Sequence, residues 1–492
     1  MKYITKIHYI NINRNIVKII LIIFGIIFLE KNKKENILEI KKFASTNNLD
    51  YKLNEIIPYN KTKKELNSQC QIIDPISNFK KRLNINSTIL CQSENSFHIC
   101  YENKLGGYVV SDGLICMMKN AIMDPSKWKD DGFQYNGPVD KSSRGMPLLS
   151  DGFFNMKCDI KGNITKFEFV YSSYVNSWKY SEYQEKNIEE LAPGKTIFFI
   201  SRNQDSPNLF HGGSEFINAF ALMKIFNYKP QDIQVIFLES MNFASNDPFF
   251  NLYKYVISGG NEPIHVRKLT KKYKISSGIH IPLNWDSPCF TYDNEPACNK
   301  PTETYYYLNQ YIDKFLYISQ FEDFRNLDDE IFYYPKKYNK EKNYRKYVTF
   351  QWRRVWPKGR TGQQRVIGNG PELVEKLSEK LPDDILLRLV NTASLPIEEQ
   401  IAIMKKTDYL IGEHGAGLFL SIFLPIKSIV HEISHIGNMR ALVRMSRLSG
   451  HLTYSNIITA QVYMIEGNEN LFFDPSNFTN CIIDSMKKSG FL

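Results

Sequence analysis

The chain has 492 residues, of which 43% are hydrophobic and 23% charged, and its formal net charge at pH 7 is +10. This length allows two or three domains, and the positive balance favours anionic partners. The positive residues are dispersed, and no basic helix with interleaved aromatic residues occurs. We therefore exclude a nucleic-acid-binding protein.

The N-terminus predicts a membrane anchor. An apolar run from Ile19 to Leu29 follows the basic residues Lys2, Lys6, Arg14 and Lys18. The run is short, since ~20 apolar residues cross a bilayer, but Ile16 and Val17 extend it and Lys18 can snorkel. No small-x-small cleavage site follows. We expect a cytoplasmic tail and uncleaved signal anchor at 1–30, in preference to a cleaved signal peptide or a buried helix, and a polar stem at 31–70.

Cysteine usage places the body of the chain in the secretory lumen. All eight cysteines lie downstream of the anchor, and the close pairs Cys91/Cys100 and Cys289/Cys298 suggest small disulfide loops, although sequence cannot settle the connectivity. The C-terminus has no Lys-Asp-Glu-Leu-type retrieval signal. We expect a single-pass type II protein of the Golgi or endoplasmic reticulum membrane.

The first patterned half of the chain predicts a βαβ unit. Strands are expected at 196–201 and 234–238, with a helix from Glu215 to Phe226 between them. This Rossmann-like part begins at about residue 195 of an N-terminal domain spanning 71–325. A charged, tyrosine-rich stretch at 326–346 indicates an interdomain linker.

The second half alternates strands and helices over 347–475, which predicts a doubly wound parallel sheet. A tail at 476–492 remains, and the segment Pro475 to Leu492 is a candidate to return to the N-terminal domain. The expected strands are 347–350, 385–390, 409–411 and 428–433, and the expected helices are 370–381, 397–406 and 439–449.

A glycine-rich turn follows the strand at 409–411. Its small residues Gly415, Ala416 and Gly417 let backbone N–H groups approach a ligand, and a helix starting there would direct its dipole at an anion. His414 adds a side chain that can bond to a phosphate or ribose. Packing alone is the alternative explanation of such a turn. Other polar residues also fall at carboxyl ends of strands, where ligands bind in such sheets: Arg353, Arg354 and Glu432.

Three segments resemble those of family 61 glycosyltransferases. Gly412-Glu-His-Gly-Ala-Gly-Leu418 followed by Phe423-Leu-Pro425 is similar to the family's signature, and Val348 to Arg353 is similar to the strand that ends in its arginine. Phe210-His-Gly-Gly-Ser-Glu-Phe-Ile-Asn218 resembles an aromatic-His-x-x-x-Asp motif, most closely that of the members directed at EGF domains. The resemblance covers roughly 195–475. The family usually has Asp where this chain has Glu215.

The resemblance implies the α/β architecture called GT-B, with two facing Rossmann-like domains and the nucleotide in the C-terminal one. Arg353, Arg354 and the N–H groups of residues 415–417 would stabilise a leaving diphosphate. His414 would orient the diphosphate or ribose. Glu432 would bind ribose hydroxyls, or would be a solvated strand-end acid.

Glu215 would be the general base, or a helix N-terminal acid that complements the dipole. His211 would orient the acceptor or the base, or would only pack. No Asp-x-Asp motif occurs, so we expect metal-independent, inverting transfer with no cofactor. The donor would be a UDP-sugar, with GlcNAc preferred over xylose, and the acceptor a protein or glycan hydroxyl. The alternatives are an inactive, membrane-anchored relative that binds a nucleotide sugar or glycan, and an unrelated binding module.

Overall fold

The computed structural model describes residues 74–85, 87–101, 115–129, 148–161, 174, 177–181, 187–201, 208–238, 247–281, 301–315, 331–334, 343–354, 365–392, 395–434 and 441–492. All described residues belong to one compact unit, Leu66–Leu492. The predicted anchor and stem lie outside the described residues. None of the described helices combines the length and apolar character that a bilayer span requires.

Within the described part of the chain, ten strands form the N-terminal sheet, in the order β11-β10-β9-β12-β3-β2-β1-β7, with β6 and β8 joined to it through β3. The strands β11, β10, β9 and β12 run parallel, and β12 pairs antiparallel with β3. The strands are β1 (Ser87–Gln92), β2 (Phe97–Tyr101), β3 (Ile115–Met123), β6 (Phe154–Met156), β7 (Ile160–Lys161), β8 (Trp178–Tyr180), β9 (Thr196–Ile200), β10 (Ile233–Phe237), β11 (Ile264–His265) and β12 (Tyr273–Ile281).

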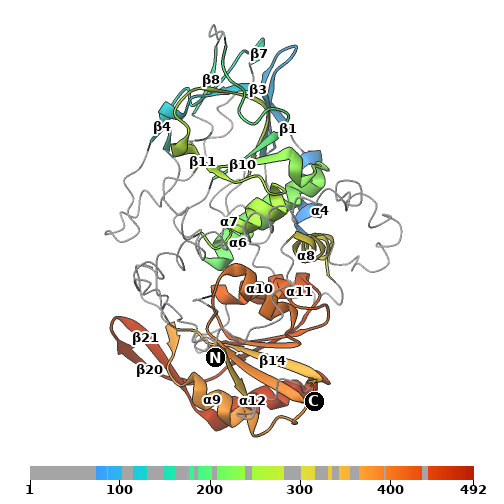
Figure 1. Ribbon diagram of the computed structural model, residues 1–492, viewed down its shortest axis with the longest axis vertical. Coiled ribbons are helices and arrows are strands. Elements are labelled where there is room, and N and C mark those ends of the chain that lie inside the picture. The colour runs from blue at the N-terminus through green and yellow to red at the C-terminus, as the bar shows by residue number, and fades with distance from the viewer. Residues whose placement is uncertain are drawn as a thin grey trace, which may run out of the picture. The chain divides into compact units, whose positions relative to one another are not determined.

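Helices of the described residues cover one face of this sheet, and Figure 1 shows α4, α6 and α8 together on that side. They are α4 (Pro75–Ile85), α6 (Leu209–Ile225), α7 (Phe250–Leu252), the π-helix η5 (Tyr253–Ile257) and α8 (Glu303–Phe315). Short 3-10 turns are η2 (Pro125–Lys127), η4 (Pro230–Asp232) and η6 (Val266–Lys268), and β4 (Trp128–Lys129) pairs with β5 (Leu148–Leu149).

The predicted βαβ unit is confirmed by β9, α6 and β10, since the two strands are parallel. Helix α6, however, begins at Leu209, six residues before the predicted start at Glu215. The reason is the residue before it: the Asn208 side chain accepts a hydrogen bond of 3.0 Å from the Phe210 N–H and caps the helix. Glu215 therefore lies in the second turn, and its interpretation as a first-turn acid was wrong.

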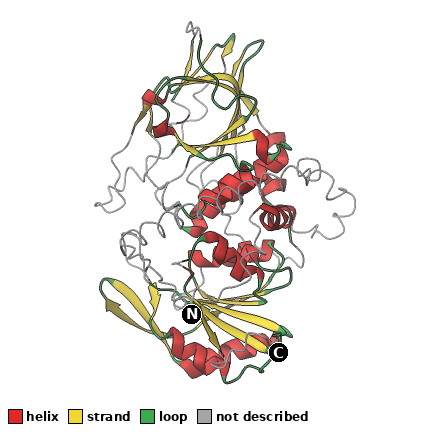
Figure 2. Ribbon diagram, in the orientation of Figure 1, coloured by secondary structure: helices red, strands yellow, loops and turns green. Residues whose placement is uncertain are grey.

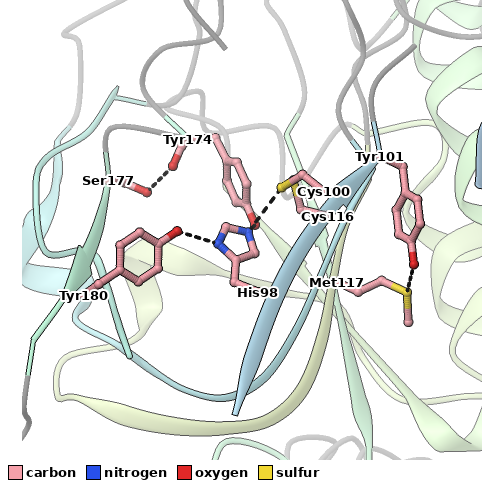
Figure 3. The surroundings of a disulfide bond; sticks show 8 residues. All are labelled: His98, Cys100, Tyr101, Cys116, Met117, Tyr174, Ser177 and Tyr180. Atoms are coloured by element: carbon pink, nitrogen blue, oxygen red, sulfur yellow. Dashed lines mark hydrogen bonds between the residues drawn. A yellow bond between two sulfur atoms is a disulfide. The ribbon is translucent and has the colours of Figure 1, made fainter. Parts of the chain in front are cut away.

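The other face of the N-terminal sheet packs against aromatic rings and disulfides (Figure 3). Disulfides join Cys91 to Cys158 and Cys100 to Cys116, so the predicted loop between Cys91 and Cys100 was wrong. The strand register explains this: Cys100 lies directly opposite Cys116 across β2 and β3, whereas Cys91 lies opposite His98. The pair Cys289/Cys298 lies outside the described residues.

The six-stranded C-terminal sheet of the described residues has the order β13-β16-β14-β17-β18-β19. All neighbours from β16 to β19 are parallel, and β13 is an antiparallel edge. The strands are β13 (Ile331–Tyr334), β14 (Lys346–Gln351), β16 (Ile385–Val390), β17 (Tyr409–Glu413), β18 (Ile429–Ser434) and β19 (Leu452–Ile457). The segment predicted as a linker thus contributes the strand β13.

Helices lie on both faces of this sheet, as the doubly wound prediction requires (Figures 1 and 2). One face packs on α9 and α12, and the other on α10, α11 and the 3-10 helix η12. The bounds are α9 (Gly370–Ser378), α10 (Ile397–Lys405), η12 (Ala416–Phe423), α11 (Ala441–Leu448) and α12 (Pro475–Lys488). The helix expected after the glycine turn is therefore a 3-10 helix.

The C-terminal tail belongs to this second sheet, because Phe478, Ile482 and Met486 of α12 are buried in the same apolar cluster as Leu373 of α9. Its suggested return to the N-terminal domain was wrong for the described residues. A further small sheet has the order β15-β21-β20, formed by β15 (Arg365–Ile367), β20 (Ala460–Ile465) and β21 (Asn468–Phe473).

One apolar cluster joins the helices of the two sheets. It contains Phe216 of α6 and Phe419 of η12, and the Phe249 and Phe419 rings lie 5.9 Å apart, edge to face. Gly213 makes a close approach possible, since a Cβ atom there would lie 2.2 Å from the Phe419 ring. Helix α6 therefore packs directly on the helix that follows the glycine turn.

Candidate functional site

The C-terminal sheet changes winding direction between β14 and β17. Numbered along the chain, its parallel strands have the spatial order 2-1-3-4-5, and the order reverses between the first and third of them. Ligands of open α/β sheets bind outside the carboxyl ends of strands at such a reversal. Arg353 follows β14 and His414 follows β17, so the fold brings two of the predicted site residues to this place.

A buried carboxylate holds two arginines there. Glu413 Oε2 accepts a hydrogen bond of 2.6 Å from Arg353 Nη1, and its Oε1 accepts one of 3.0 Å from Arg365 Nη1. Arg353 Nη1 also donates to the carbonyl oxygen of His414 at 2.6 Å. The Glu413 side chain is 0% exposed, while those of Arg353 and Arg365 are 25% and 20% exposed. The carboxylate is thus buried, and both guanidinium groups remain accessible to solvent.

The glycines of the turn make room for side chains of β14. A Cβ atom at Gly415 would lie 2.0 Å from Arg353 Nη1, and one at Gly417 would lie 2.5 Å from Gln351 Nε2. Gln351 in turn donates from Nε2 to Thr392 Oγ1 at 2.8 Å. The turn therefore allows a close approach to its backbone, as predicted. The groups that approach it are side chains of the protein, Arg353 and Gln351.

His414 is held by a carboxylate on the next strand. Its Nδ1 lies 2.5 Å from Glu432 Oε1, and Glu432 Oε2 accepts a hydrogen bond of 3.1 Å from Ser455 Oγ. Glu432 is only 2% exposed, so its interpretation as a solvated strand-end acid was wrong. A carboxylate on Nδ1 fixes the ring orientation and leaves Nε2 as the nitrogen available to a ligand.

Arg354 lies apart from this cluster in its contacts. It is exposed, and its guanidinium carbon lies 4.8 Å from the centre of the Trp352 ring, a cation–π geometry. Arg353 and Arg365 therefore form the arginine pair on Glu413, and the donor-binding role of Arg354 stays a prediction.

The predicted acid–base residues lie on α6. His211 is half-buried with its ring 5.7 Å from that of Phe210, and Glu215 is 0% exposed. Each is two residues from Gly213, where α6 packs on Phe419 of η12. The fold thus brings the helix of His211 and Glu215 against the helix that starts at Ala416.

Sequence reasoning missed Glu413 and Arg365. Glu413 stands inside the glycine-rich motif itself, and a charged residue in an otherwise apolar and glycine-rich segment was the available signal. No comparable signal pointed to Arg365, because the residues around it in the sequence form no recognisable motif. The described residues contain a group close enough to hold a metal ion, His98, Cys100 and Cys116, but the disulfide between the two cysteines uses both sulfurs.

Comparison with known proteins finds matches to the part of the chain that contains β14 and β17. Residues 275–431 match the family model of Glycosyltransferase 61. This range includes Arg353, Arg365 and the His414 turn but not α6. A stretch of 97 residues is 33% identical to the EGF domain-specific O-linked N-acetylglucosamine transferase of Bos taurus. That match covers 20% of this chain and 18% of the bovine protein. On these matches, residues 275–431 of the chain are similar to glycosyltransferase family 61.

Proposed function

We propose that this protein is an inverting glycosyltransferase that moves a sugar from a UDP-sugar to a hydroxyl group of a protein or glycan. GlcNAc is the preferred sugar, and xylose is the alternative. The observation that carries the proposal is the position of Arg353, Arg365 and the His414 turn at the strand-order reversal, inside the region that matches the family. The name of the bovine relative supports GlcNAc.

The donor would bind through its diphosphate. Arginine offers a planar fork of N–H donors that fits phosphate oxygens, and Arg353 presents such a fork beside the turn at residues 415–417. As the bond to the sugar breaks, negative charge grows on the diphosphate, and fixed cations nearby stabilise it. His414, oriented by Glu432, would bind the diphosphate or ribose through Nε2. This arrangement would use arginines in place of a divalent metal, so transfer is expected to persist in EDTA.

The acceptor hydroxyl would be activated from α6. Glu215 is the proposed general base and His211 the group that orients the acceptor or the base. Direct attack by the deprotonated hydroxyl on the sugar carbon would invert its configuration. The packing of Gly213 on Phe419 supports this pairing of elements, because it brings α6 against the helix that follows the donor turn. The two sheets would then act as the halves of a GT-B enzyme, anchored by residues 1–30 in the Golgi or endoplasmic reticulum membrane.

A thermal-shift panel on the full-length protein tests the proposal. UDP, UDP-GlcNAc, UDP-xylose, GDP and CMP would each be added in the presence of EDTA. Stabilisation by UDP and by one UDP-sugar is the expected result, and it would name the donor. A chain that responds to none of these nucleotides would refute the transferase proposal.

A second candidate function is an inactive relative that binds a nucleotide sugar without transferring it. The observation in its favour is the complete burial of Glu215, since a general base must reach the hydroxyl whose proton it takes. Hydrolysis of the UDP-sugar that stabilises the protein separates the two functions. Slow release of free sugar supports the enzyme, and binding without any release supports the inactive relative.

A further inference from the structure

We infer that Arg353 and Arg365 together form a clamp for the diphosphate of the donor, and that Glu413 is the positioning residue that holds the two guanidinium groups side by side. This inference rests on the proposed function and assigns residues to the same site. It concerns two residues, Arg365 and Glu413, for which the sequence predicted no role.

The geometry of the carboxylate sets the spacing of the pair. Each Glu413 oxygen accepts from a different guanidinium group, at 2.6 Å from Arg353 and 3.0 Å from Arg365. Among the described residues, the side chain of Arg365 donates its hydrogen bond from Nη1 to Glu413, which leaves its other guanidinium N–H groups for water or a ligand. The carboxylate is fully buried and both arginines are partly exposed, so the pair presents cationic groups outward.

Arg353 follows a strand of the large C-terminal sheet and Arg365 begins a strand of the small sheet, and the backbone fixes their relative position. Arg365 begins β15, which belongs to the small sheet with β21. The Ile367 N–H donates to the Arg353 carbonyl at 2.9 Å, and Trp352 Nε1 donates to the Ile367 carbonyl at 2.9 Å. These two bonds tie β15 to the chain that leaves β14. A site held this firmly before the ligand arrives loses little entropy on binding.

The chemistry of the ligand follows from the number of arginines. One guanidinium fork is sufficient for a single phosphate group, and two adjacent forks match the two phosphorus centres of a diphosphate. Arg365 would therefore distinguish nucleoside diphosphates, and sugars activated by them, from nucleoside monophosphates. In the reaction it would share with Arg353 the charge that develops on the departing UDP.

The test compares UDP with UMP on the full-length protein by calorimetric titration in EDTA. Wild-type protein is expected to bind UDP about 100-fold more tightly than UMP, since each charge-assisted contact contributes about 10- to 100-fold. Arg365→Met is expected to weaken UDP binding about 10-fold or more and to leave UMP binding within about threefold, so that the ratio collapses. Arg365→Lys, which keeps the charge without the fork, is expected to give an intermediate ratio.

Glu413→Gln tests the positioning role. Its amide oxygen can accept from one guanidinium, while its NH₂ group opposes the other, so the UDP to UMP ratio should fall as it does in Arg365→Met. Matched controls are Arg345→Met and Asp384→Asn, because Arg345 Nε and Asp384 Oδ2 form a 2.7 Å ion pair just before the amino end of β14. These controls should keep the wild-type ratio.

The outcomes separate the two proposals. If wild-type protein binds UDP but Arg365→Met keeps the wild-type ratio, the clamp is overturned and the proposed function stands. If wild-type protein binds neither nucleotide, the proposed function fails and the clamp fails with it. The unliganded melting temperature of each variant checks the fold, and Arg365→Met decides the matter if Glu413→Gln does not fold.

Discussion

The two sheets share a parallel core but carry opposite chemistry at the point where their strand order reverses. In the N-terminal sheet, the reversal lies between β9 and β12, in the spatial order 3-2-1-4 along the parallel strands. Ser201 Oγ and His280 Nε2 share a hydrogen bond of 3.1 Å there, and the His280 ring stacks on Tyr174 at 3.8 Å. In the C-terminal sheet, the same position holds Arg353, Glu413 and their ionic contacts.

Burial explains the difference. In the aromatic layer of the N-terminal sheet, burial and the nearby His280 lower the pKa of His98 to about 3, so its ring is neutral at physiological pH. The His98 ring stacks on that of Trp178. His98 also shares a 2.8 Å hydrogen bond with the Tyr180 hydroxyl (Figure 3). At the C-terminal sheet the two arginines, Arg353 and Arg365, are partly exposed to solvent. A parallel core therefore provides a place for a ligand, and the residues after its strands decide whether an anion can bind there.

The largest expected effect is acid lability. Burial lowers the pKa of His98 and His451 to about 3 and that of His431 to about 4. Unfolded histidine titrates near 6.5, so the unfolded chain takes up protons first, and stability present above pH 6.5 is lost as the pH falls toward the folded values. Between pH 7 and 5, each histidine should cost about 2 kcal/mol and the three together about 6 kcal/mol.

Urea unfolding at pH 7, 6 and 5 measures this loss. His98→Gln should reduce the pH slope by about one proton and so isolate the share of the N-terminal sheet. Unfolding free energies that stay constant over this range would contradict neutral, buried histidines.

The next effect concerns the disulfides of the N-terminal sheet. The bond between Cys91 and Cys158 closes a sequence separation of 67 residues. Replacing both cysteines by alanine should lower the unfolding free energy by roughly 4 kcal/mol, because the unfolded chain regains freedom. Cys481→Ala is the matched control, since Cys481 is a half-buried free thiol. UDP affinity should not change, and a parallel loss of UDP binding would show that the two regions are coupled.

Arg353→Met, at the C-terminal sheet, should have the opposite effect to removal of the disulfide. We expect a large loss of UDP binding and a small loss of stability. Truncating one charged partner of a buried contact costs about 2–5 kcal/mol, so UDP affinity should fall about 100-fold. Stability should change less, because Arg365 still donates to the buried Glu413 and water can replace part of the contacts of a guanidinium that is 25% exposed. Calorimetric titration compares the UDP affinity of Arg353→Met with that of the control Arg345→Met. Equal affinities would show that Arg353 does not bind the donor.

The smallest effect is expected for Gly415→Ala. The added methyl group would lie 2.0 Å from Arg353 Nη1 and would move the guanidinium. A displacement of this kind should reduce UDP affinity by roughly tenfold. Ala416→Gly, at the next position, removes a methyl group from the same turn and should bind UDP nearly as the wild type does. Gly415→Ala with unchanged UDP affinity would show that the position of Arg353 is not critical.

Much of the C-terminal half was predictable from residues 347–475. Ile385–Val390 was predicted at its observed bounds, and Ile397, Ile401 and Met404 of α10 are buried as its periodicity indicates. These predictions used local signals: the hydrophobic periodicity, a proline at a helix start (Pro371) and a glycine at a helix end (Gly450). Each signal involves residues only a few positions apart, so the sequence alone reveals it. The ends of the strands could be located for the same reason. Arg353 and His414 could therefore be predicted to lie at carboxyl ends of strands.

Other features depended on contacts between distant residues, which only the tertiary structure decided. Arg353 and Arg365 meet Glu413 from sequence separations of 60 and 48 residues, once strand order has brought β14, β15 and β17 together. Cys100 pairs with Cys116 because the register of β2 and β3 sets them opposite each other. By itself, the sequence determined most elements of the C-terminal half and the carboxyl-end position of the proposed donor site. Strand order and register decided which charges share that site, because no local pattern specifies a partner so far along the chain.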